Sequence, residues 1–123
     1  MKKYAQVCVL SKSQQLDKLF TYKIPIDKKN NKYIGKKVLV PFGRGNSVRE
    51  GFIIKLTDKT KYKKIKKIKY VLDDDISLTK EDINLIYYIK NKYMATFSEV
   101  INLIITSGTK IKRTTYYKVI KKK

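Results

Sequence analysis

The chain has 123 residues, enough for one domain with a single compact core. It carries 30 Lys and Arg against 10 Asp and Glu, a formal net charge of +20. This favours a polyanionic partner: nucleic acid first, with an acidic membrane surface or ribosomal RNA as alternatives. Histidine is absent and Cys8 is the single cysteine, which excludes a histidine base, a disulfide framework and the usual zinc sites.

Signatures of membrane insertion and nucleotide hydrolysis are missing from the sequence. The start of the chain leads directly into a strand-like pattern, and no stretch approaches the roughly 20 apolar residues of a membrane helix. No phosphate-binding loop of the Gly-x-x-x-x-Gly-Lys-Ser/Thr form occurs. Cys8, between two valines, is expected to be a small buried residue in a reducing cytoplasm. We therefore expect a cytoplasmic protein with no membrane partner, and no catalytic residue, metal site or cofactor in this chain.

Short apolar stretches predict strands in the first two-thirds of the chain, at about residues 4–10, 19–24, 37–42, 50–56 and 65–72. Turn-forming residues separate them at 27–31, 43–47 and 57–60. Five short strands at this spacing predict a small, curled, partly closed sheet or barrel of about five to six strands.

Helical spacing replaces the strand pattern after Asp75. Thr79 followed by Asp82 matches a capping box, which predicts that a helix begins there. Ser98 is predicted to cap a second short helix that runs to Gly108. The predicted fold class is therefore α+β, with two C-terminal helices packing across one opening of the sheet. We expect a domain at residues 1–108 and a basic linker at 109–123.

The segment at residues 38–45 (Val-Leu-Val-Pro-Phe-Gly-Arg-Gly) and the one at 50–54 (Glu-Gly-Phe-Ile-Ile) predict a β-hairpin with a glycine-bearing loop. Pro41 removes a backbone donor and so belongs near a strand end or a sheet edge. Gly43 allows a positive φ and a close approach by a ligand. Taken alone, a hairpin is weak evidence for any function.

The hairpin becomes informative with its flanking segments. A strand opens the chain at residues 4–10, Leu-Asp-Lys-Leu-Phe-Thr-Tyr-Lys-Ile-Pro follows at 16–25, and Val-Leu-Asp ends a strand at 71–73. This ordered set resembles, over residues 3–110, the amino-terminal DNA-binding domain of bacterial primosomal protein N′, the PriA replication-restart helicase.

The resemblance implies a module that recognises the 3′-hydroxyl end of a nascent strand at stalled replication forks. Its expected partners are branched or single-stranded DNA with a free 3′ end, and other primosome or single-strand-binding proteins through the full-length protein. The resemblance places the helicase motor, with its ATP, Mg and Zn, outside this chain.

The family's 3′-end pocket maps onto Phe20, Thr21, Tyr22, Gly43 and Lys66. Strand alternation puts Phe20 and Tyr22 on one face with Ile24, where either aromatic could be a core residue or the wall for an unstacked base. Many relatives have an aspartate where Thr21 stands, and a hydroxyl lacks the charge-assisted strength of a carboxylate. A phosphate on the terminal 3′ oxygen is expected to weaken binding, because it adds bulk and negative charge to a fitted pocket.

The run at 59–70 holds seven lysines and no acid, a pattern that most often marks a solvated face. On a strand, Lys66 would share a face with Ile68, Tyr70 and Leu72. The apolar spacing of this run also permits a helix, but the resemblance to the PriA domain favours a strand. Five further cations are expected to contact phosphates: Arg44, Arg49, Lys63, Lys64 and Lys67.

Two other classes of function fit the sequence. One is a non-specific single-stranded nucleic-acid-binding domain of the oligonucleotide-binding-fold type, with a basic surface and tyrosines but no end recognition. The other is a protein-interaction module whose charge docks onto an acidic partner.

Overall fold

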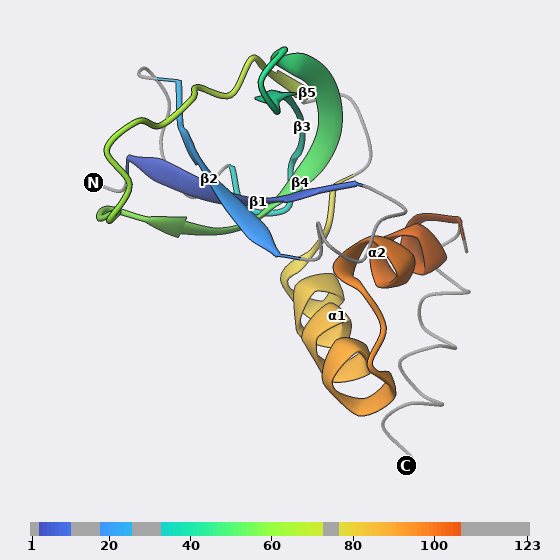
Figure 1. The fold of residues 1–123 in the computed structure, drawn as a ribbon. Helices are drawn as coiled ribbons and strands as arrows, with labels where there is room; N and C mark the ends of the chain where they lie inside the picture. The colour runs from blue at the N-terminus through green and yellow to red at the C-terminus, as the bar shows by residue number, and fades with distance from the viewer. Residues whose placement is uncertain (1–2, 11–17, 26–32, 73–76, 107–123) are drawn as a thin grey trace.

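The computed structural model describes residues 3–10, 18–25, 33–72 and 77–106. It has five strands followed by two helices (Figure 1): β1 (Tyr4–Val9), β2 (Leu19–Lys23), β3 (Lys37–Phe42), β4 (Ser47–Thr57), β5 (Tyr70–Leu72), α1 (Lys80–Tyr93) and α2 (Phe97–Thr106). The strands form one antiparallel sheet in the order β2-β1-β4-β3-β5. The α+β prediction is confirmed.

The sheet curls because its central strand β4 bends where it crosses β1. The pairing with β1 shifts register between Gln6 and Val7, where Lys55 and Ile53 are the β4 partners and Ile54 is the extra residue. A bulge of this kind increases the local twist of a strand. Figure 1 shows β4 as a long, strongly curved ribbon.

A connector at residues 66–69 links the two edges of the curled sheet. The Lys23 backbone N–H donates to the Lys66 carbonyl (2.9 Å), and the Ile68 N–H donates to the Lys23 carbonyl (3.0 Å). On the opposite edge, the Lys69 N–H donates to the Leu39 carbonyl of β3 (2.8 Å). The sheet is therefore partly closed by this connector and is not a continuous barrel.

The predicted strand at 65–72 is wrong in its extent, since β5 begins only at Tyr70. Ile68 is buried, whereas Tyr70 is 58% exposed, so Tyr70 does not share the buried face predicted for it. The hydrogen bonds give the reason. Residues 66–68 pair with β2, whereas residues 69–72 pair with β3. The side chains therefore do not alternate regularly between the two faces where the pairing partner changes.

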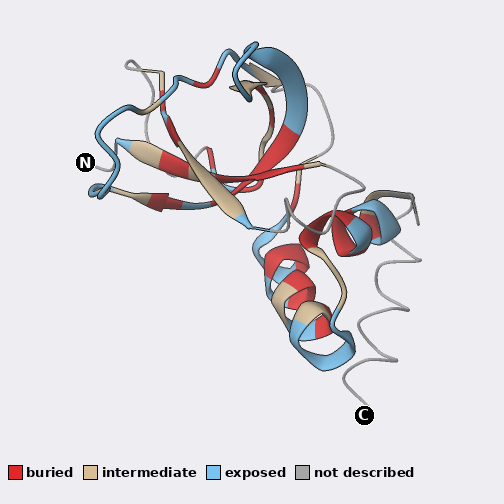
Figure 2. Cartoon of the chain, viewed as in Figure 1, coloured by how far each residue is buried: buried red, intermediate tan, exposed pale blue. Residues whose placement is uncertain are grey.

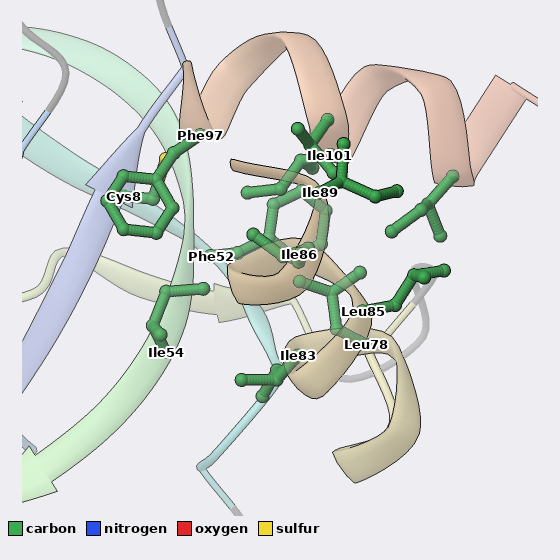
Figure 3. Packing of buried hydrophobic residues seen from close by; sticks show 12 residues of the cluster. Cys8, Phe52, Ile54, Leu78, Ile83, Leu85, Ile86, Ile89, Phe97 and Ile101 are labelled. Atoms are coloured by element: carbon green, nitrogen blue, oxygen red, sulfur yellow. The ribbon is translucent and has the colours of Figure 1, made fainter. Parts of the chain in front are cut away.

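The buried residues, coloured red in Figure 2, form two clusters that strand alternation places on opposite faces of the sheet. The sheet core fills the inside of the curl and consists of Ala5, Val7, Val9, Tyr22, Ile24, Tyr33, Val38, Val40, Ile53, Leu56 and Ile68. The helix–sheet core lies outside the curl, where Cys8, Phe52 and Ile54 face residues of both helices (Figure 3). Cys8 is buried, as predicted.

Both helices begin at reciprocal capping boxes. At α1, the Thr79 N–H donates to Asp82 Oδ2 (2.9 Å) and the Asp82 N–H donates to Thr79 Oγ1 (3.0 Å), which confirms the predicted start. At α2, the Thr96 N–H donates to Glu99 Oε1 and the Glu99 N–H donates to Thr96 Oγ1, both at 3.1 Å. The prediction that Ser98 caps this helix is therefore wrong. Ser98 lies inside the first turn and is buried.

Several predictions lie outside the described residues: the turn at 27–31, the residues at 73–75, the helix end at Gly108 and the linker at 109–123. Within the described ranges, neither helix is long and apolar enough to cross a membrane.

Gly35 joins the helical half of the molecule to the sheet. Its N–H donates to the Ile53 carbonyl, and its own carbonyl accepts from the Leu78 N–H, both at 2.7 Å. Its φ is +84°, and an added Cβ would lie 1.9 Å from the Leu78 carbonyl oxygen. Only glycine satisfies both constraints.

Replacing Gly35 by alanine is therefore expected to lower the free energy of unfolding by more than about 3 kcal/mol, through backbone strain and a clash with backbone. Gly45→Ala is the matched control, because an added Cβ there meets no atom within 4 Å. It should change stability by about 0.5 kcal/mol or less. Urea denaturation followed by circular dichroism measures both, and equal stability of the two variants would contradict the assigned role of Gly35.

Candidate nucleic-acid pocket

Three segments far apart in the sequence converge on one pocket of about 430 Å³. They are β2 with the residue before it, the end of β3 with its turn, and the loop that leads into the connector. The wall consists of Lys18, Leu19, Phe20, Thr21, Tyr22, Pro41, Phe42, Gly43, Tyr62, Lys64, Ile65 and Lys66. All five residues that the family resemblance assigns to the pocket are in this wall.

Tyr22 forms the buried part of the wall and fixes β2 against β3. It is 4% exposed and belongs to the sheet core, which is one of the two alternatives that the alternation on β2 leaves open. Its hydroxyl donates to the Pro41 carbonyl oxygen (2.9 Å). Burial raises the pKa of Tyr22 from its ordinary value of 10.0 to about 12, so the phenol stays protonated and keeps donating in alkaline solution as well as at neutral pH. Tyr22 is therefore both a core residue and part of the pocket.

Phe20 and Phe42 form a second aromatic element at the rim. Their ring centroids are 5.1 Å apart with planes nearly perpendicular, a favourable edge-to-face arrangement. The Lys18 ammonium lies 5.3 Å from the Phe20 centroid, and the Arg49 guanidinium lies 5.8 Å from the Phe42 centroid. The two rings are thus flanked by cations on both sides.

Gly43 begins the β3–β4 turn with a φ of +75°, and its carbonyl accepts from the Asn46 N–H (3.2 Å). An added Cβ at Gly43 would meet no protein atom within 4 Å. Packing within the protein therefore does not require glycine here, whereas the backbone conformation favours it.

Lys66 connects the third segment to this turn. Its ammonium donates to the Gly43 carbonyl oxygen at 2.6 Å, across 23 residues of sequence. Its backbone carbonyl accepts from Lys23 on β2, which fixes the start of the side chain. Lys66 lies on the connector and not on a regular strand, so its position at the pocket comes from these two hydrogen bonds.

The five supporting cations do not behave alike. Lys64 is in the pocket wall, and Arg49 lies beside the wall through its contact with Phe42. Arg44, Lys63 and Lys67 are exposed and contribute nothing to the wall. Sequence reasoning missed Lys18 and Tyr62 as wall residues. In the sequence, each of them stands beside other aromatic or cationic residues. This pattern is a weak signal for a binding site in a chain with 10 tyrosines and so many lysines.

The side chains of the wall suit one kind of ligand. It contains three lysines, four aromatic side chains and no carboxylate. Aromatic rings stack on bases, and ammonium groups bind phosphate or ribose oxygens. Within the described residues, no group of three metal-ligating side chains is present. The wall suits a ligand that is both anionic and aromatic, which is the combination found in a nucleotide.

Comparison with known proteins identifies the family of this domain. A search of curated proteins found no match to the chain. A sequence model of the 3′DNA-binding domain (3′BD) of PriA matches residues 6–106, a range that includes the whole pocket wall. The match covers most of the chain, so this DNA-binding domain belongs to the PriA 3′DNA-binding domain family.

Proposed function

We propose that this domain holds the 3′-hydroxyl end of a nascent strand at stalled replication forks, with the terminal nucleotide in the described pocket. Phe20, Thr21, Tyr22, Gly43 and Lys66 line the site for that nucleotide. Arg44, Arg49, Lys63, Lys64 and Lys67 contact the phosphates that lead into it. The domain serves replication restart in the cytoplasm, as part of a primosome helicase whose ATP, Mg and Zn sites and protein contacts lie in other parts of the full-length protein.

The observation that carries the proposal is the joining of three segments around one aromatic, cationic pocket. The 2.6 Å hydrogen bond from Lys66 to Gly43 makes the wall continuous between the connector and the turn. A wall that is continuous on this side suits a strand that ends there better than one that passes through. The absence of carboxylates from the wall leaves the lysines able to attract DNA.

Binding to linear and circular single strands of one sequence tests the proposal. A linear strand with a free 3′ hydroxyl should bind more tightly than the circle, and a small neutral cap on the 3′ oxygen should remove the difference. The same cap on the 5′ end is the matched control and should have no effect. A neutral cap is preferable to a 3′-phosphate, since three wall lysines attract a phosphate while its bulk opposes entry. Equal affinity for the circular and the linear strand would favour a non-specific single-stranded nucleic-acid-binding domain.

Gly43→Asn probes the pocket without disturbing the turn, because asparagine tolerates a positive φ. Its side chain should occupy space needed by the nucleotide and weaken binding of free 3′ ends by about tenfold, equivalent to about 1.4 kcal/mol. Affinity for capped ends should not change. Gly45→Asn adds the same group to the same turn, outside the wall, and should bind as the parent does. Fluorescence anisotropy provides the readout, and similar affinities for the two variants would argue against the pocket.

The lysines outside the wall should provide affinity without end recognition. Replacing Lys63 and Lys67 together by glutamine should weaken binding to all DNA substrates equally. If each contacts one phosphate, the slope of log K against log salt for single strands should fall in magnitude by about 1.4. The control variant, Lys80→Gln with Lys92→Gln, removes the same charge from helix α1, which contributes no residue to the wall and lies outside the lysine-rich loop. An unchanged slope in the first variant, or the same change in the control, would show that Lys63 and Lys67 are not phosphate contacts.

Thr21 should set the response of the pocket to charge on the terminal nucleotide. Thr21→Asp introduces a carboxylate into a wall that has none, which should disfavour a 3′-phosphate relative to a 3′ hydroxyl by about tenfold. Thr21→Asn is the neutral control of similar shape. The ratio of the two dissociation constants is the measurement. A ratio that is the same in both variants would place the 3′ oxygen far from Thr21.

A further inference from the structure

We infer that a second surface, the outer side of the sheet at β1, β2 and the end of β4, binds an unpaired DNA strand. This surface lies outside the pocket and adjoins it at Thr21, which is in the pocket wall. The inference deepens the proposed function, because it gives a path to the strand that leads away from the terminal nucleotide. Circular strands test it separately, since they can reach this surface without offering an end.

Strand pairing brings six side chains together on this surface, the outer sheet face. They are Tyr4 and Gln6 on β1, Thr21 and Lys23 on β2, and Lys55 and Thr57 on β4. In the register of the sheet, Tyr4 lies opposite Lys23 and Thr57, and Gln6 lies opposite Thr21 and Lys55. The residues between them, Ala5, Tyr22 and Leu56, are buried in the sheet core, so the six side chains point outward.

The helices cover the neighbouring part of the outer side and leave this part open. Two positions further along β1 is Cys8, and its partner on β4 is Phe52; both are buried in the helix–sheet core. On the outer sheet face, Lys23 and Lys55 are exposed, and Tyr4 is half-buried. The face is therefore a solvent-accessible surface on paired strands, with the helices as its border.

The outer sheet face is cationic, and none of its six residues is acidic. Lys67 of the connector pairs with Lys23 in a parallel bridge, which places two lysines side by side at the β2 edge. Like charges directly opposite one another in a sheet repel. Within the described ranges, the ammonium groups of Lys23, Lys55 and Lys67 have no ion-pair partner. A phosphate bound between Lys23 and Lys67 would relieve the repulsion that the protein itself leaves in place.

Tyr4 and Gln6 provide groups that suit a base. Tyr4 lies on the central strand of the face, between Lys23 and Thr57, and an aromatic ring accepts any base by stacking. The Gln6 amide offers donors and an acceptor and has no side-chain hydrogen bond within the part of the chain that the structure describes. A ring among lysines on paired strands suits a single strand, whose bases stack while its phosphates bind cations.

Replacing Lys23 and Lys55 together by glutamine tests the cationic part of the face. Affinity for circular and for long linear single strands should fall by about tenfold, and the slope of log K against log salt should fall in magnitude by about 1.4 if each lysine contacts one phosphate. Dinucleotides with a free 3′ hydroxyl, which reach only the pocket, should bind as they do to the parent protein. Lys80→Gln with Lys92→Gln on α1 removes the same charge away from the face and should leave the slope unchanged.

Strands that lack one base test the stacking on Tyr4. An abasic nucleotide moved stepwise upstream from the 3′ end should weaken binding to the parent protein by about tenfold at one position before the terminal nucleotide. Tyr4→Leu keeps an apolar side chain and should lose this sensitivity, whereas Tyr4→Phe should keep it. Tyr70→Leu removes an exposed ring from β5 and is the matched control, which should behave as the parent does. Circular dichroism verifies that each variant is folded.

The outcomes separate the two proposals. Equal binding of linear and circular strands by the parent protein overturns the end-holding function, whereas weaker binding of the circle by the Lys23 and Lys55 variant supports the outer sheet face in either case. A lysine variant that binds long strands as its α1 control does would overturn the face as a DNA surface and favour an acidic protein as its partner. A Tyr4→Leu variant as sensitive to the missing base as the parent, or a parent insensitive at every upstream position, overturns the stacking on Tyr4.

Discussion

The connector at residues 66–69 is the constraint on which both the fold and the pocket depend. Its backbone bonds with Lys23 of β2 and with Leu39 of β3 link the two edges of the curled sheet. The same segment delivers the Lys66 ammonium to the Gly43 carbonyl on the hairpin turn. A single hydrogen bond contributes only about 1 kcal/mol net, so the main effect of these bonds is to fix position. Without them, Lys64, Ile65 and Lys66 would have no defined place opposite β2, and the pocket would lack its third wall.

The two hydrophobic clusters separate stability from function. The helix–sheet core covers the outer face of β1 and β4 with α1 and α2, and neither helix contributes to the pocket wall. The sheet core fills the curl and reaches the pocket through Tyr22 and its neighbours Phe20 and Phe42. The surface of the connector loop can therefore carry closely spaced lysines, whose mutual repulsion opposes compactness and is relieved when a polyanion binds. The charge thus costs some stability in the free protein and favours association with DNA.

The sequence predicted what depends on local pattern and failed where tertiary pairing decides. Alternation located the strands up to β4, and the hydroxyl and carboxylate of Thr79 and Asp82 located the start of α1. The cap of α2 was assigned to Ser98 because Thr96 and Ser98 are both good capping residues two positions apart, and only the bonds with Glu99 distinguish them. The strand at 65–72 was overextended because no local signal shows that residues 66–68 pair with one strand and residues 69–72 with another. The five pocket residues came from the family resemblance, whereas Lys18 and Tyr62 became visible only when the three segments were brought together.

The geometry of Lys66 explains how a flexible side chain can form part of a defined pocket. A lysine ammonium has three donors and loses considerable rotamer freedom when it is held in place. Here one donor is already bound to the Gly43 carbonyl, so much of that entropy is already lost in folding. In the proposed complex, a ribose or phosphate oxygen binds the remaining donors without first ordering the side chain. The same bond holds the Gly43 turn, whose open Cβ direction leaves room beside the pocket. One contact between a lysine and a glycine carbonyl therefore positions a cation and shapes the adjoining wall at the same time.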